Sequence, residues 1–243
     1  MFSVIFEVKR KKEKQDEYMK LAMGLKPLLR TIDGFIDNER FESQLKKEWL
    51  LSHSTWRDEK SVVRWRTEAK HHATQVKGRF EIFDDYHLRV GEIVSDTSPP
   101  AGIPVAQHRL DESEISAAKF ASLTEMTLAA QNPFGADPTQ VLEHLGIDRS
   151  QSGLLEHDVY KSVSAIYPDD RPYQEGKLAL LLTWASSAAA AAWTPKTFDG
   201  VRALRHRVVR VVRDYGMFDR REAPQYYRDV EGGKATLHPA PIH

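Results

Sequence analysis

The sequence has no cysteine among its 243 residues. Disulfide bonds, thiolate nucleophiles and thiolate metal ligands are therefore excluded, and the absence is compatible with a reducing cytoplasm. Excess charge is absent as well, because 35 Lys and Arg residues balance 35 Asp and Glu residues. A chain without net charge has no overall field that would attract nucleic acid or an anionic membrane surface.

Long apolar runs are missing too, and none approaches the roughly 20 residues that a transmembrane helix requires. Met1 leads directly into strand-like residues, so we expect no signal peptide. We therefore predict a cytoplasmic protein that binds neither nucleic acid nor a membrane.

Two pairs of tryptophans recur at identical spacing in the two halves of the chain. They are Trp56 with Trp65 and Trp184 with Trp193, and a threonine precedes the first member of each pair. Each pair follows a strand-like apolar run and precedes a Val- and Arg-rich strand-like stretch. Such a repeat indicates one module of about 100 residues that is present twice. We place the first unit at 1–95, a Pro-rich linker at 96–116, the second unit at 117–215 and an irregular tail at 216–243.

Both halves have the same predicted order of elements, strand-helix-strand-strand-helix-strand. In the first unit we expect strands at 2–8, 35–43, 48–55 and 86–94 and helices at 13–32 and 58–77. In the second unit we expect strands at 120–128, 153–163, 177–184 and 204–215 and helices at 137–146 and 186–193. Residues 166–175 form an enlarged connection, and part of the tail should wrap the partner unit. Pro27 should kink or divide the first helix, because proline lacks an amide hydrogen.

This order of elements is typical of the ferredoxin-like fold, a four-stranded antiparallel sheet with helices on one face. The other face of each sheet must also be buried. We therefore predict an α+β protein in which two ferredoxin-like βαββαβ units pack sheet to sheet, as a pseudo-dimeric barrel within one chain. Association of these fused pseudo-dimers into a homo-oligomer stays open.

A family resemblance rests on one stretch of the first unit. The run Thr55-Trp56-Arg57-Asp58-Glu59, followed by Trp65-Arg66, His71, Gln75 and Gly78-Arg79, resembles the antibiotic biosynthesis monooxygenase family. The resemblance covers most of residues 2–95 and is weaker over 117–215, where Thr194 replaces Arg66 and no histidine follows. It implies a dimeric α+β barrel that oxygenates electron-rich aromatic substrates without a cofactor or, in one branch, binds and oxidatively opens haem.

Three histidines are candidates for a catalytic base. On an uninterrupted helix His72 lies on the same stripe as Trp65, whereas the spacing of the family points to His71, so both are kept. His53 lies on the third strand where the second unit has Leu181, which suggests an inward-facing polar group. An imidazole that titrates near neutral pH is suited to remove a phenolic or enolic proton. The alternatives are a core histidine and a histidine that faces solvent.

Aromatic and polar side chains near these histidines are candidates for substrate binding. Trp65 and Trp193 offer flat faces for an aromatic ring, although an inward tryptophan can also be simple core. Asn38, Ser61 and Tyr86 could orient a substrate oxygen. In characterised oxygenases of the family an asparagine stands where this chain has Ser61. The haem-opening branch has a further asparagine where this chain has Phe6-Glu7, which disfavours haem.

Neither a metal nor a phosphate ligand is predicted. Adjacent histidines on a helix diverge by about 100° and cannot easily share one ion. The final strand carries five arginines, and because valines alternate with them we interpret this strand as an ordinary solvated sheet face. These are Arg202, Arg205, Arg207, Arg210 and Arg213.

We therefore predict a cofactor-independent monooxygenase that uses O2 on a small hydroxylated aromatic or enolic molecule. One alternative is a non-enzymatic small-ligand-binding or structural module. The other is a haem-binding, haem-degrading monooxygenase.

Overall fold

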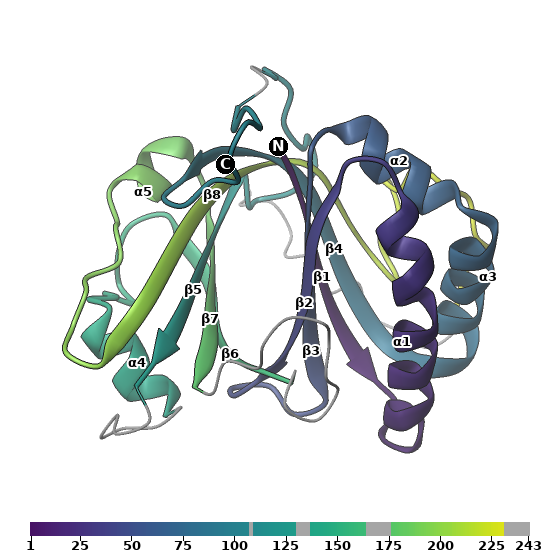
Figure 1. The fold of residues 1–243 in the computed structure, drawn as a ribbon, viewed down its shortest axis with the longest axis horizontal. Helices are drawn as coiled ribbons and strands as arrows, with labels where there is room; N and C mark the ends of the chain where they lie inside the picture. Colours follow the sequence, from purple (N-terminus) through teal and green to yellow (C-terminus); the bar gives the residue numbers. More distant parts are fainter. Residues whose placement is uncertain (107–108, 130–136, 164–175, 231–243) are drawn as a thin grey trace.

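The computed structural model describes residues 1–106, 109–129, 137–163 and 176–230. The strands of the first half are β1 (Phe2–Arg10), β2 (Phe35–Ser43), β3 (Trp49–Trp56) and β4 (Phe83–Asp96). Those of the second half are β5 (Phe120–Leu128), β6 (Leu154–Ser162), β7 (Lys177–Trp184) and β8 (Val201–Gly216). They form one closed antiparallel barrel in the order β1-β3-β2-β6-β7-β5-β8-β4 (Figure 1). The predicted α+β class is confirmed.

The two halves of the barrel have the same internal strand order, β4-β1-β3-β2 and β8-β5-β7-β6. Their registers also correspond, because Phe2 pairs with Trp56 on β3 and Phe120 pairs with Trp184 on β7. The β2–β6 pair and the longer β4–β8 pair join the halves. Trp56 and Trp184 therefore occupy equivalent places in the fold.

Helices cover the outer faces of the barrel (Figure 1). The first half has α1 (Gln15–Thr31), α2 (Glu59–Thr67) and α3 (Ala69–Lys77), with short turns η1 (Lys12–Lys14) and η2 (Gly78–Ile82). The second half has the shorter helices α4 (Pro138–His144) and α5 (Ser187–Ala191). None of the helices in the described residues is long and apolar enough to cross a bilayer. The enlarged connection predicted at 166–175 lies outside the described residues.

Of the two effects expected of Pro27, division of the helix is wrong, because α1 runs unbroken to Thr31. The expectation of a single helix at 58–77 is also wrong. This stretch is broken at Glu68, whose backbone is extended with φ −63° and ψ 130°. The Glu68 carboxylate accepts a hydrogen bond from the backbone N–H of His71 and so caps α3. The break changes which side chains of α3 face the sheet.

The core is divided between the inside of the barrel and the spaces under the helices. Apolar side chains such as Ile5, Phe41, Leu51 and Val211 meet in the barrel interior. Buried charged groups share this interior, including Arg89, which is hydrogen-bonded to Glu7. Because successive side chains of a strand point to opposite faces, the alternate residues of the first-half strands face the helices and meet the site described next.

Candidate active site

A cavity of about 220 Å³ lies between helices α1, α2 and α3 and the outer face of the first-half sheet. Its apolar wall comes from both layers and includes Val4, Phe6, Leu25, Leu88 and Val90. The second half completes it, because Tyr215 of β8 and Gln225 and Tyr227 of the following segment also line the cavity. This placement confirms that part of the tail wraps the other half of the molecule.

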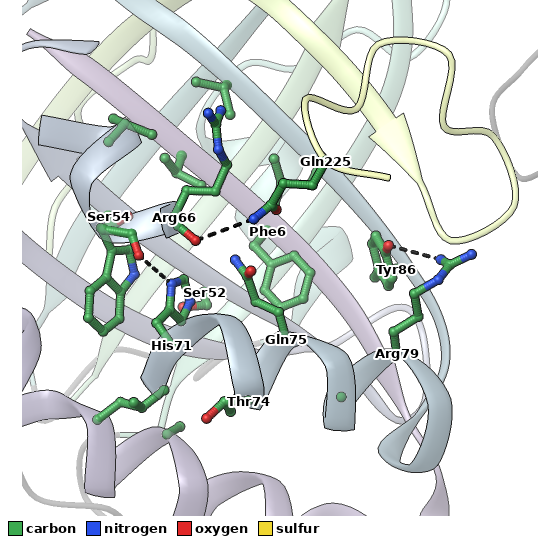
Figure 2. Close-up of a pocket in the computed structure, with 18 of the residues that line it drawn as sticks. Phe6, Ser52, Ser54, Arg66, His71, Thr74, Gln75, Arg79, Tyr86 and Gln225 are labelled. Carbon is green, nitrogen blue, oxygen red and sulfur yellow. Dashed lines mark hydrogen bonds between the residues drawn. The ribbon is translucent and has the colours of Figure 1, made fainter. Parts of the chain in front are cut away.

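Trp65 and His71 form an aromatic stack in the wall of the cavity. Their ring centroids are 4.0 Å apart and their planes differ by 13°. Nδ1 of His71 lies 2.7 Å from the carbonyl oxygen of Trp65. A carbonyl can only accept, so Nδ1 carries the hydrogen and Nε2 is left as an acceptor. Burial lowers the pKa of His71 to about 4, so the imidazole is neutral at neutral pH. Figure 2 shows His71 and Gln75 pointing from α3 toward the sheet.

His72 lies outside the cavity and is exposed. Its ring stacks on Tyr227 with centroids 5.8 Å apart, and Nδ1 lies 3.3 Å from Nε2 of Gln225. The prediction that His72 faces inward beside Trp65 is therefore wrong. It assumed one helix over 58–77, and the break at Glu68 turns His71 toward the tryptophan instead.

His53 is buried on the other side of the sheet. Only 2 % of its surface is exposed, and Nε2 lies 2.8 Å from Oγ of Ser3 in the barrel interior. The expectation of an inward-facing polar group is confirmed. However, the neighbours Ser52 and Ser54 line the cavity and His53 does not, because alternate residues of β3 face opposite sides.

Asn38 and Tyr86 lie in the cavity wall, as a substrate-binding role requires. Asn38 Nδ2 donates to Ser52 Oγ at 3.2 Å and to the carbonyl oxygen of His53 at 2.8 Å. The Tyr86 hydroxyl accepts hydrogen bonds from Arg79 at 3.1 Å and from Arg220 at 2.6 Å. Figure 2 shows the Arg79–Tyr86 contact at one end of the view.

Ser61 and Trp193 are not brought to this cavity. Ser61 is fully buried and donates from Oγ to Asp58 at 2.7 Å, next to the cap of α2. It packs so closely on Gly34 that a Cβ there would lie 2.0 Å from Ser61 Oγ. Trp193 belongs to the apolar core of the second half, where its ring centroid lies 6.2 Å from that of Trp184.

The site also contains arginines that the sequence reasoning did not assign. Five arginines line the cavity, whereas Glu59 is the one acidic residue in the wall formed by described residues, and it pairs with Arg109. The five are Arg40, Arg66, Arg79, Arg213 and Arg220. Arg66 and Arg79 belong to the run that resembles the family. This resemblance was the feature of the sequence that could have identified them as site residues.

The interpretation of the final strand as a solvated face is wrong for three of its arginines. Arg207 is buried and forms an ion pair with Glu125. Arg205 pairs with Asp96 at 2.7 Å, and Arg213 lines the cavity. Within the described part of the chain, no group of three His, Asp or Glu side chains could hold a metal ion.

The fold and the site together are those of an α+β-barrel protein that encloses a small-molecule cavity on the outer face of its sheet. The family model for antibiotic biosynthesis monooxygenases matches residues 1–77. A relative from Pyricularia oryzae, named jasmonate monooxygenase ABM, is 37% identical over 232 residues, which cover 93% of this chain and 98% of the relative. The chain belongs to the antibiotic biosynthesis monooxygenase family. It is an oxidoreductase of the monooxygenase type.

One solved structure shows likeness at the level of the fold, and a second matches part of the chain with a lower score. An aldoxime dehydratase in complex with butyraldoxime is 10% identical, with a TM-score of 0.50 over 86% of this chain and 79% of that chain. An antibiotic biosynthesis monooxygenase is 15% identical, with a TM-score of 0.34 over 39% of this chain and 100% of that chain.

Proposed function

We propose that this monooxygenase is cofactor-independent and oxidises a small hydroxylated aromatic or enolic molecule with O2 in the cavity beside Trp65. The observation that carries the proposal is the His71–Trp65 pair. The hydrogen bond to the Trp65 carbonyl oxygen holds the imidazole in the tautomer whose Nε2 can accept a proton. In this proposal, the apolar wall binds the ring or chain of the substrate and keeps water away from the reacting carbon.

The proposed reaction balances without an external reductant. His71 Nε2 removes a proton from a substrate CH2 group that is activated by a neighbouring hydroxylated ring or enol. The resulting carbanion gives one electron to O2, and the substrate radical and superoxide combine into a peroxide. The peroxide regains the proton from His71 and loses water, which leaves a carbonyl at that carbon. One oxygen atom enters the substrate, the other leaves as water, and the CH2 carbon supplies all four electrons.

The lowered pKa of His71 makes the imidazole a weak base, so the substrate anion must itself be stabilised. The guanidinium groups of the cavity wall can do this, because a positive charge favours the charged form of a nearby acid. Asn38 and Tyr86 would orient the substrate oxygen. The relative is named for jasmonate, and jasmonate is therefore the first compound to test.

We further propose that the two halves are duplicated ferredoxin-like units, residues 1–95 and 117–215, joined by the linker 96–116. The identical strand orders and the matching pairs Phe2–Trp56 and Phe120–Trp184 support this. In this arrangement the second unit is a scaffold, because Trp193 fills the core of that unit. Strand β8 and the segment after it complete the cavity of the first unit.

Oxygen uptake with jasmonate and a panel of hydroxylated aromatic compounds tests the proposal, with haem-free and haem-supplemented protein in parallel. Loss of a general base costs on the order of 100-fold or more in rate, so we expect His71→Gln to lower kcat/KM by at least about 100-fold. His72→Gln is the matched control and should retain activity within about twofold. Unchanged turnover in His71→Gln, or turnover that requires haem and appears with a Soret band, would refute the proposal.

A further inference from the structure

Three arginines from separate parts of the chain gather around one buried phenol. Arg66 on α2, Arg213 on β8 and Arg220 after β8 all act electrostatically on the Tyr215 hydroxyl. All four residues line the cavity. The Arg220 guanidinium lies over the Tyr215 ring at 5.5 Å and over the Tyr227 ring at 4.9 Å. The cluster therefore depends on the β4–β8 contact that brings the second half beside the first.

Among the described residues, these guanidinium groups have no anionic hydrogen-bond or ion-pair partner. Those of Arg66 and Arg213 form no hydrogen bond or ion pair with any residue that the structure describes. Among the described residues, Arg220 donates to uncharged oxygens, at 2.6 Å to Tyr86 and at 2.9 Å to the Gln225 carbonyl. Nε of Arg66 and Nε of Arg220 are buried without a hydrogen-bond partner among the described residues.

The three arginines are half-buried, so their charges are partly removed from water. Each charge destabilises the fold to the extent that it loses water without gaining an opposite charge or hydrogen bonds. The acidic residue of the cavity wall, Glu59, already pairs with Arg109. Asp111, which lies within the electrostatic range of Arg213, also pairs with Arg109. The compensating anion is therefore expected to come from a ligand.

We infer that Arg66, Arg213 and Arg220 form a subsite for an anionic group, a carboxylate or a sulfonate, on the molecule that occupies the cavity. Guanidinium groups suit this role, because their planar fork donates two parallel hydrogen bonds to such an anion. Burial raises the pKa of Tyr215 to about 12, so its hydroxyl keeps its hydrogen and can donate to the same anion. The inference depends on the proposed function in one respect, namely that the molecule in the cavity is the substrate.

A pair of fluorescent probes that differ by one anionic group tests the subsite. 8-Anilinonaphthalene-1-sulfonate carries a sulfonate, and N-phenyl-1-naphthylamine has the same aromatic body without it. Both brighten on entering an apolar site. A hydrogen bond to a charged group contributes enough for about a tenfold change in affinity. We therefore expect the sulfonate to bind at least about tenfold more tightly than the amine.

The variants Arg66→Met and Arg213→Met keep the apolar stem and remove the charge. Each should weaken binding of the sulfonate about tenfold and leave binding of the neutral probe unchanged. Arg64→Met is the matched control, because Arg64 lies on the same helix, pairs with Asp33 and is outside the cavity wall. It should change neither affinity. Arg213→Lys, which restores a point charge without the fork, should recover part of the lost affinity.

Equal affinity of the unsubstituted protein for the two probes would overturn the inference. So would arginine variants that lose both probes together, because that result indicates damage to the cavity rather than loss of an anion contact. Thermal melting of each variant checks the fold. Probe binding does not depend on oxygen uptake, so selective sulfonate binding without turnover would refute the proposed reaction and leave the subsite standing.

Discussion

Arg79 on η2 donates a 2.7 Å hydrogen bond to the carbonyl oxygen of Met217, just beyond the end of β8. The same guanidinium donates to Tyr86 in the cavity wall and to the carbonyl oxygen of Arg228. Arg79 is buried, with 2 % of its surface exposed. One side chain of the first half therefore holds the second-half segment that closes the cavity.

Replacement of Arg79 by methionine should loosen this segment. The substitution removes the donor of a buried hydrogen bond to the Met217 carbonyl oxygen and of a partly buried one to the Arg228 carbonyl oxygen, at a cost of about 1–3 kcal/mol in the free energy of unfolding. We expect faster hydrogen exchange of the amides at 217–230 together with a lower urea midpoint. Arg221→Met is the control, because Arg221 is exposed and pairs only with the adjacent Asp219 among the described residues, and it should cost less than about 1 kcal/mol. Unchanged exchange in Arg79→Met would contradict the role given to Arg79.

His71 should make stability depend on pH. Burial lowers its pKa from 6.5 to about 4, so the unfolded chain binds a proton more readily than the folded chain between these values. The neutral imidazole therefore contributes its full stability above about pH 6.5, and this contribution is lost as the pH falls toward 4. One pKa unit corresponds to about 1.4 kcal/mol, so the loss is on the order of 3 kcal/mol.

Urea unfolding of the unsubstituted protein and of His71→Gln, each at pH 7.5 and pH 4.5, measures this effect as the difference between their losses of stability. His71→Gln cannot titrate at this position, so its loss of stability on acidification should be smaller. His206, whose pKa burial also lowers to about 4, titrates in both proteins and cancels in the comparison. Equal losses in the two proteins would show that the environment of His71 does not suppress its protonation.

Arg89 should stabilise the fold through the carboxylates that it contacts inside the barrel. Its guanidinium lies 2.7 Å from Glu7, 3.1 Å from Glu156 and 3.4 Å from Asp214. Arg89→Met leaves these carboxylates without their shared cation, and removal of one partner from a buried ion pair costs about 3–5 kcal/mol. The exposed Arg57–Asp33 pair provides the control, since Arg57→Met should cost less than about 1 kcal/mol. Differential scanning calorimetry should show a large fall in Tm for the first variant alone.

The positions of the strands could be predicted from the sequence, because β-branched and aromatic residues mark them and turn residues separate them. Residues 35–43, 120–128 and 177–184 are strands with the predicted limits. The break at Glu68 could not be predicted, since residues 58–77 contain no Pro or Gly. Contacts outside the local sequence pattern accompany this break, above all the stacking of His71 on Trp65.

The residues of the cavity wall could not be predicted from local sequence patterns either. Alternation of Val and Arg on β8 predicts one buried and one solvated face. In a closed barrel the inner face is buried and helices or loops can cover the outer face, so neither face of β8 is simply solvated. Arg207 points into the interior and Arg213 into the cavity for this reason. The contributions of Tyr215 and Gln225 arise from the β4–β8 contact, which no spacing within either half contains.

The two recurring tryptophans should differ in what their loss affects. Trp193 is 5 % exposed within the apolar core of the second half, and Phe or Trp to Ala changes in cores cost about 3–5 kcal/mol. Trp65 is partly exposed to the cavity, so Trp65→Ala should cost less stability, since water can enter the space. Its loss removes the surface on which His71 stacks, and we expect kcat/KM to fall on the order of tenfold or more for Trp65→Ala. Trp193→Ala should leave kcat/KM within about threefold wherever the protein is still folded.

Urea titration and steady-state kinetics on both variants separate the two roles. A Trp193 variant that folds but is inactive would show that the second half takes part in catalysis rather than serving as a scaffold.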